Sequence, residues 1–168
     1  MQKNAFIHDC ERRLKDLKKK RTKNMKLNIK KLNENAVIPT YGTEFSAGAD
    51  LYNSDTPAVI APHTTTIIHT GIAIEIPEGY CGLIFARSGL ATKRGLAPAN
   101  KVGVIDADYR GEIMVALHNH SDLPAEVSAF ERVAQLAIVP FLKAEFEVVD
   151  DLSDTVRGTG GFGSTGTK

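Results

Sequence analysis

Asp106 is the residue whose surroundings best suit acid–base chemistry. It follows the apolar residues Val104 and Ile105 in the segment 100–111, which favours a β-hairpin with Asp106 and Tyr109 near its turn. A partly buried carboxylate at such a place can act as a base towards water. The alternative is a turn carboxylate that accepts bonds from backbone N–H groups, which is the commoner role of a single Asp. Both interpretations stay open at this point.

A second segment, Arg87-Ser88-Gly89, combines a cation and a hydroxyl where a strand gives way to a short helix. The first turn of a helix presents free N–H groups and the positive end of its dipole, which together attract anions. The competing interpretation treats Ser88 as an ordinary N-cap and explains the fragment equally well.

The last twelve residues, 157–168, contain five glycines. Glycine lets backbone N–H groups approach a phosphate closely, hydroxyls add donors, and Arg157 supplies charge. Phe162 could stack on a base. On composition alone a disordered tail is the better interpretation, and the spacing fits neither of the common glycine-rich phosphate loops.

Other polar residues lie within apolar runs. Arg132 and Gln135 fall in an apolar strand and need partners if they are buried. His118 and His120 share one strand face, and without a third ligand a surface pair is favoured over a metal site. Cys10 and Cys81 support neither a disulfide framework nor a zinc site, which favours a reducing, cytoplasmic setting.

Composition limits the class of protein. The chain has 168 residues, of which 42% are hydrophobic and 24% charged, which fits one domain and excludes a disordered chain. The longest apolar stretch, residues 136–142, is far shorter than the roughly 18–20 residues of a membrane helix. The charged first 26 residues do not resemble a secretory signal.

The net charge of +1 hides an asymmetry between the two parts of the chain. Residues 1–31 carry 12 Lys and Arg against three acidic residues, so the remainder has a net charge of −8. An acidic body argues against nucleic-acid reading by the body itself. The basic arm has three interpretations: a solvated extension, which we favour, a nuclear-address or phosphate-binding cluster at residues 18–21, or sequence upstream of a functional start at Met25.

From Lys26 onward the pattern is that of short strands. Apolar residues alternate at 72–76, 81–85, 113–117 and 144–148, and a longer apolar run covers 133–141. One short helix is expected over residues 88–94, ended by Gly95. Many short strands with frequent turns predict an all-β sandwich or jelly-roll-like barrel rather than alternating β/α units.

Five segments, taken in order, resemble the motifs of the homotrimeric dUTPase family (dUTP diphosphatases). They are residues 46–51 (SAGADL), 87–91 (RSGLA), 103–111 (GVIDADYRG), 132–135 (RVAQ) and 157–166 (RGTGGFGSTG). Any one would be weak, whereas five in order are specific. The resemblance implies a jelly-roll-like distorted β-barrel, a homotrimer with three active sites between subunits, and a C-terminal arm that closes a neighbour's site. We expect a basic extension at 1–25, the dUTPase-like domain at 26–150 and the arm with its glycine-rich motif at 151–168.

The resemblance also implies a reaction and its chemical groups. Asp106 would be the general base for water that attacks the α-phosphorus of dUTP, giving dUMP and diphosphate. Mg²⁺, held mainly by the triphosphate rather than by protein ligands, would neutralise charge. Asp50 and Arg132 would act behind the contact residues, with Asp50 ordering active-site water.

The remaining residues of the motifs would bind substrate. Phosphate oxygens would be held by Arg87, Ser88, Gly89 and Gln135, and by Arg157, Gly163, Ser164 and Thr165 once the tail closes. Asn100 and main-chain groups around Val104 would pair with uracil. Tyr109 would pack under the deoxyribose and exclude a 2′-hydroxyl, and Phe162 would stack on the base.

Two other functions compete with this one. A dCTP deaminase has a broadly similar fold but needs a glutamate-centred site, and ammonia release from dCTP would reveal it. A non-catalytic jelly-roll interaction module predicts no diphosphate release from dUTP. The presence of both Asp106 and the glycine-rich tail argues against the second alternative.

Overall fold

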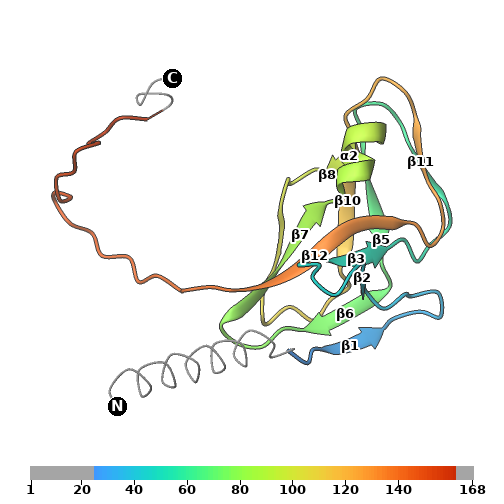
Figure 1. Ribbon diagram of the computed structural model, residues 1–168, viewed down its shortest axis with the longest axis horizontal. Coiled ribbons are helices and arrows are strands. Elements are labelled where there is room, and N and C mark those ends of the chain that lie inside the picture. Colours follow the sequence, from blue (N-terminus) through green and yellow to red (C-terminus); the bar gives the residue numbers. More distant parts are fainter. Residues whose placement is uncertain (1–24, 162–168) are drawn as a thin grey trace, which may run out of the picture.

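The computed structural model describes residues 25–161, which form twelve strands and one short helix (Figure 1). The strands are β1 (Asn28–Lys31), β2 (Thr40–Tyr41), β3 (Ala49–Tyr52), β4 (Ala58–Ile60), β5 (Thr65–His69), β6 (Ile72–Glu75), β7 (Tyr80–Ala86), β8 (Leu96–Pro98), β9 (Gly103–Ile105), β10 (Met114–Asn119), β11 (Ala125–Val127) and β12 (Arg132–Pro140). The helix is α2 (Ser88–Arg94). The expected all-β class is confirmed. The basic arm up to residue 24 and the tail from Phe162 lie outside the described residues.

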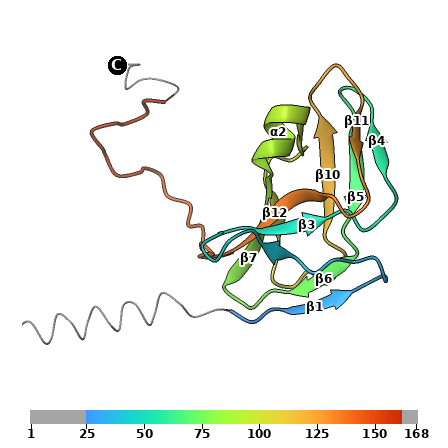
Figure 2. The same cartoon turned by 45° about the vertical axis from the view of Figure 1, so that its right-hand side comes forward.

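All strand pairs are antiparallel and fall into four sheets. The largest has the order β2-β3-β12-β7-β9, and the others are β5-β10-β8, β1-β6 and β11-β4. Within residues 25–161 these sheets stay open rather than closing into one barrel. β12 crosses the middle of the body between β3 and β7 (Figures 1 and 2). The long strand β12 therefore joins the elements that carry three of the five motifs.

The core is built from the alternating aliphatic residues that the sequence predicts. Ile72, Ile74 and Ile76 are all buried, and so are the alternating residues at 113–117. Burying one such side chain contributes about 1.5–3 kcal/mol. In β7 the buried face is not the one that carries the alternating residues 81, 83 and 85: Ile84 is buried, whereas Phe85 is 39% exposed. The cause is close packing, because a Cβ on Gly82 would lie 3.0 Å from Leu136.

The expected helix at 88–94 is confirmed, with its end at Gly95. Gly95 adopts φ 66°, a left-handed conformation that glycine enters at low cost, and its N–H donates to the carbonyl of Leu90. Lys93 and Arg94 stand in the last turn, where positive charge is favoured. Arg87, not Ser88, is the N-cap, and no side chain caps the helix. The N-cap interpretation of Ser88 is therefore wrong.

Two expected elements differ from the structure. The segment 100–111 is not a hairpin, because β8 pairs with β10 while β9 pairs with β7. The segment instead leads from β8 in one sheet into β9 in another. The strand expected at 144–148 is also absent: residues 141–149 have no ladder partner, and Phe146 and Val148 are almost fully exposed. Figure 1 shows this segment leaving the body, so an apolar strand pattern here finds no sheet edge within its own chain.

Among the described residues, no helix is long and apolar enough to cross a membrane.

Candidate active site

Asp50 joins two arginines from different motifs. Its carboxylate accepts a hydrogen bond from Arg87 Nε at 2.9 Å on one oxygen and from Arg132 Nη1 at 3.2 Å on the other. The Asp50 side chain is 4% exposed, whereas those of Arg87 and Arg132 are 25% and 49% exposed. A buried carboxylate thus holds two guanidinium groups at the surface, where they can meet an anion.

The five-stranded sheet brings these residues together. β12 places Gln135 opposite Asp50 of β3 and opposite Phe85 of β7. Arg132 lies across from Tyr52, next to a register shift before Ala134. Gly48 leaves room for Gln135, because a Cβ on Gly48 would lie 3.1 Å from the Gln135 Cβ. The first, second and fourth motifs therefore meet where the three interior strands β3, β12 and β7 lie side by side.

Ser88 and Gly89 open α2 beside Arg87. The first turn contains no acidic residue, and the Ala91 N–H already donates to the Arg87 carbonyl at 3.0 Å. A Cβ on Gly89 would meet nothing within 4 Å in this chain. The space over Gly89 is thus open to a group from outside the chain.

Asp106 lies in a different place. It follows β9 at the start of the connection to β10 and is exposed, not partly buried as the sequence predicts. It lines a cavity of about 730 Å³ together with Gly79, Asp108, Phe141 and Lys143. That cavity is bounded by the β6–β7 turn and by residues 141–143, which follow β12.

Asn100, Val104 and Tyr109 lie before, within and after β9. Asn100 is in the turn before β9, where a Cβ on Gly103 would lie 3.4 Å from the Asn100 amide nitrogen. Val104 is 59% exposed on β9. The Tyr109 hydroxyl donates to the carbonyl of Glu112 at 3.0 Å. Val104 and Tyr109 therefore lie within three residues of Asp106, whereas Asn100 precedes β9, whose first residue Gly103 pairs with Ile84 of β7.

The register of β7 separates the two groups of residues. Gly82 pairs with Ile105, which puts Asp106 beside the start of β7, whereas Arg87 follows its end. About six residues of strand lie between them, or roughly 20 Å at ~3.3 Å per residue. Two groups that act on one phosphate must both lie within hydrogen-bond reach of it. One chain therefore does not bring Asp106 to Arg87.

The tail holds one described site residue. Arg157 lies in a turn where its Nε donates to the Gly160 carbonyl at 2.8 Å. The described chain after β12 runs away from the body (Figure 1). Phe162, Gly163, Ser164 and Thr165 lie outside the described residues. Their roles remain predictions.

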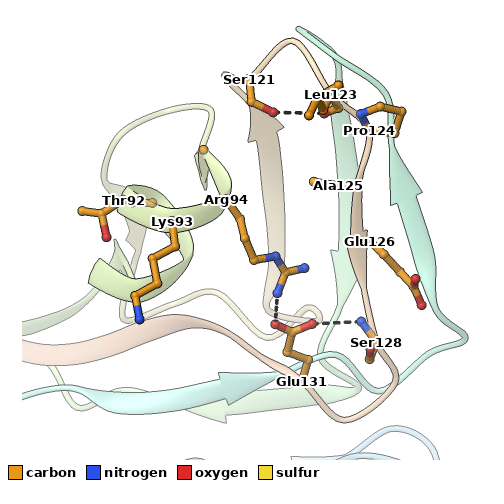
Figure 3. A pocket seen from close by; sticks show the side chains of 12 residues that line it. Thr92, Lys93, Arg94, Ser121, Leu123, Pro124, Ala125, Glu126, Ser128 and Glu131 are labelled. Carbon is orange, nitrogen blue, oxygen red and sulfur yellow. Dashed lines mark hydrogen bonds and ion pairs between the residues drawn. The ribbon is translucent and has the colours of Figure 1, made fainter.

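A cavity of about 750 Å³ lies between α2 and β11 (Figure 3) and is lined by none of the predicted site residues. Arg94 of α2 forms an ion pair with Glu131 across it, and Glu131 also accepts from the Ser128 N–H at 2.9 Å. These contacts tie the end of α2 to the residue before Arg132, which fixes the helix relative to β12.

Sequence reasoning missed Glu112. Its carboxylate accepts from the Gly71 N–H at 2.7 Å and contacts His69 Nδ1 at 2.9 Å. The available signal was a charged residue directly before the buried alternation that begins at Ile113.

The paired histidines lie as predicted, with the rings of His118 and His120 edge to face and 4.5 Å apart. Partial desolvation, followed by the charges of His118, Lys101 and His63, holds the pKa of His120 below its ordinary value. Between residues 25 and 161 no group of three or more His, Cys, Asp or Glu is arranged to hold a metal ion.

Comparison with known proteins decides the family. A family model described as dUTPase matches residues 34–166, which span all five motifs. The chain belongs to the dUTPase family. The deoxyuridine 5′-triphosphate nucleotidohydrolases of a Picosynechococcus and a Hydrogenobaculum species are 52% and 51% identical to it over 143 and 144 residues. These alignments cover 85% and 86% of this chain and the whole of each relative.

Solved dUTPase structures have the same fold. A mutant dUTPase of Staphylococcus bacteriophage 80alpha with dUpNHpp matches with a TM-score of 0.79 and 30% identity, over 86% of this chain and 100% of that one. A mutant dUTPase from phage phi11 of S. aureus, which shows the coordination of a structural Mg(II) ion, matches with a TM-score of 0.68 and 28% identity, over 76% and 98% of the two chains. The expected jelly-roll-like dUTPase fold is confirmed.

Proposed function

We propose that this chain hydrolyses dUTP to dUMP and diphosphate by Mg²⁺-assisted attack of water on the α-phosphorus, in sites shared between the subunits of a homotrimer. The family assignment makes it a dUTP diphosphatase, and the proposal concerns how it works. We place this reaction in the cytoplasm, where it limits uracil incorporation into DNA and supplies dUMP for dTMP synthesis.

The observation that carries the proposal is the separation of the two groups of site residues. The Arg87–Asp50–Arg132 cluster and Asp106 lie at opposite ends of β7, roughly 20 Å apart by strand rise. Both groups match the family, so both are needed, and a second subunit has to bring one to the other. A closed symmetric oligomer repeats that contact at every interface.

Asp106 activates the water. Its exposed carboxylate adjoins a cavity, and among the described residues no side chain or N–H donates to its oxygens. Asp106 can therefore accept the proton of a water molecule while the water oxygen attacks the α-phosphorus. The bond from that phosphorus to the bridging oxygen breaks as the new bond forms, and diphosphate leaves.

The arginine cluster binds the phosphates. The sequence leads us to expect that Asp50 orders active-site water. Both of its carboxylate oxygens instead accept from Arg87 and Arg132, so we assign to Asp50 the positioning of these two guanidinium groups. Arg87 with the Ser88 and Gly89 N–H groups holds phosphate oxygens, and Gln135 adds a polar contact from β12. Donors fixed before the reaction cost no reorganisation when charge develops.

Mg²⁺ fits the donors that are present. An ion bound chiefly by a triphosphate needs few protein ligands, and Asp108, which lines the same cavity as Asp106, offers a carboxylate of the type that Mg²⁺ prefers while Asp106 stays free to act as the base. When bound, the ion supplies neutralisation of phosphate charge and a fixed conformation of the triphosphate.

The segment 100–109, which includes β9, selects the nucleoside. Asn100 and the main chain around Val104 pair with the uracil edge, and cytosine would leave a buried polar group unpaired at a cost of about 1–3 kcal/mol. Tyr109 packs under deoxyribose and leaves no room for a 2′-hydroxyl.

The tail acts as the lid. Arg157 and, from the motif beyond the described residues, Phe162, Gly163, Ser164 and Thr165 close over base and phosphates of a neighbouring subunit's site. Closure excludes water and strengthens the electrostatic contacts inside.

Diphosphate release measured in parallel with dUTP, dCTP, dTTP and UTP, with and without Mg²⁺, tests the proposal. We expect release from dUTP with Mg²⁺ and at least about 100-fold less from the other three substrates. Ammonia from dCTP would instead indicate a deaminase, and no release from dUTP would indicate a non-catalytic module.

A further inference from the structure

The connection between β9 and β10 has a fixed end, and Glu112 fixes it. Glu112 Oε1 accepts the Gly71 N–H at 2.7 Å, and Glu112 Oε2 lies 2.9 Å from His69 Nδ1. Its side chain is 22% exposed and that of His69 is 45% exposed. One carboxylate thus ties the chain two residues before β10 to the β5–β6 turn, and β5 and β10 lie side by side (Figure 2).

The backbone next to Glu112 is held to the same turn. The Ile113 N–H donates to the Ile72 carbonyl at 2.8 Å, and the Thr70 hydroxyl donates to the Ile113 carbonyl. Gly71 adopts φ 67°, and a Cβ on it would lie 2.7 Å from the Ser54 hydroxyl. Glycine is therefore required where the backbone N–H faces the Glu112 carboxylate.

This fixed end in turn holds Tyr109. The Glu112 carbonyl accepts the Tyr109 hydroxyl at 3.0 Å. Gly111 provides the space, because a Cβ there would lie 2.4 Å from the hydroxyl oxygen and 2.6 Å from Cζ of Tyr109. Gly111 has no left-handed φ, so the requirement for glycine comes from the aromatic ring and not from the backbone.

We propose that Glu112 and Gly111 are positioning residues that set the orientation of the Tyr109 ring and thereby the preference for deoxyribose over ribose. Glu112 acts through its carbonyl, which its own side chain anchors to Gly71 and His69. Gly111 acts because it has no side chain that would overlap the Tyr109 ring. This inference rests on the proposed role of Tyr109 under the sugar.

The test is the ratio of kcat/KM for dUTP to that for UTP. For Gly111→Ala the displaced ring lowers this ratio by about tenfold or more, chiefly through a higher KM for dUTP. Tyr109→Phe keeps the ring and removes one hydrogen bond, which lowers the ratio by about twofold to tenfold. Glu112→Ala should also lower the ratio. Glu112→Gln still accepts a hydrogen bond from the Gly71 N–H and should keep most of the wild-type ratio.

The matched control is Gly42→Ala, where a Cβ would meet only ordinary contact at 3.7 Å from Ser46. It should leave the ratio unchanged. Melting temperatures of all variants identify losses of folding, and Tyr109→Phe and Glu112→Gln keep the test valid if the Ala variants unfold. A purely structural role would lower the rates for both substrates equally, and an unchanged ratio in Gly111→Ala and Tyr109→Phe would overturn the inference.

The wild-type chain separates this inference from the function on which it rests. If wild type fails to prefer dUTP over UTP, the proposed role of Tyr109 is wrong. If wild type prefers dUTP and the positioning variants keep that preference, the inference about Glu112 and Gly111 alone is wrong.

Discussion

At the scale of single residues, one carboxylate is free to act and another is fully engaged. Asp106 is exposed beside a cavity, whereas Asp50 is buried and bonded to two arginines. The same chemical group can therefore serve as a base in one place and as an anchor in the other, because its surroundings decide its role.

Replacing Asp106 by Asn tests the first of these roles. Asn keeps the size and polarity of the side chain but takes up no proton at neutral pH, so turnover of dUTP should fall by about 100-fold or more. Binding of an unreactive dUTP analogue, measured by calorimetry, should stay within a few-fold of wild type. Persistent hydrolysis by the variant would remove Asp106 from its role.

Replacing Asp50 by Asn tests the second role. Asn offers one acceptor where two guanidinium groups need one each, so a partly buried cation loses its partner and stability should fall by about 1–3 kcal/mol. The KM for dUTP should rise as Arg87 loses its orientation. The matched control is Asp122→Asn, which breaks an exposed pair with His63 and should cost less than about 1 kcal/mol. Equal effects of the two changes in urea unfolding would contradict the assignment.

At the scale of elements, the sequence predicts the helices and strands that a local residue pattern determines. The helix at 88–94 and the buried alternations at 72–76 and 113–117 are present as expected. The strand expected at 144–148 is absent, because a strand needs a partner edge that the pattern does not name. The inward face of β7 could not be predicted either, since both of its faces are apolar and the contact of Gly82 with Leu136 selects one.

The tail offers a prediction at this scale. A chain that ends at Val156 should keep its melting temperature, because the described part of the deleted segment, residues 157–161, pairs with no strand of the body. Its kcat/KM for dUTP should fall by about 100-fold or more, since the lid is lost. As a control, a chain without residues 1–24 should keep its activity, because the family match begins at residue 34. Normal activity of the tail deletion would refute the lid.

The turn after β10 offers a prediction about pH. Desolvation and the charges of His118, Lys101 and His63 lower the pKa of His120 from its ordinary value of 6.5. The unfolded chain therefore binds more protons than the folded chain as pH falls below about 6.5, and stability decreases there. His120→Gln should reduce the loss of melting temperature between pH 8 and pH 5.5. A loss as large as in wild type would show that His120 does not contribute.

At the scale of the whole molecule, the sequence identifies the site residues but not their distances. Five motifs indicate the family, and the structure groups the first four of them into two sets at opposite ends of β7. Nothing in the spacing of Arg87 and Asp106 along the chain shows this separation, because it depends on the pairing of β7 with β9. Glu112 was missed for the same reason, since its partners Gly71 and His69 lie some forty residues away.

The most direct test of the central claim mixes two inactive variants, Asp106→Asn and Arg87→Ala. If each site takes Asp106 from one subunit and Arg87 from another, mixed trimers contain some sites with both residues intact, and random exchange should restore about a quarter of the wild-type dUTP hydrolysis. Exchange of subunits is verified by native mass spectrometry on differently tagged chains. No recovery in verified mixed oligomers would contradict a shared site and place both residues in the same subunit's site.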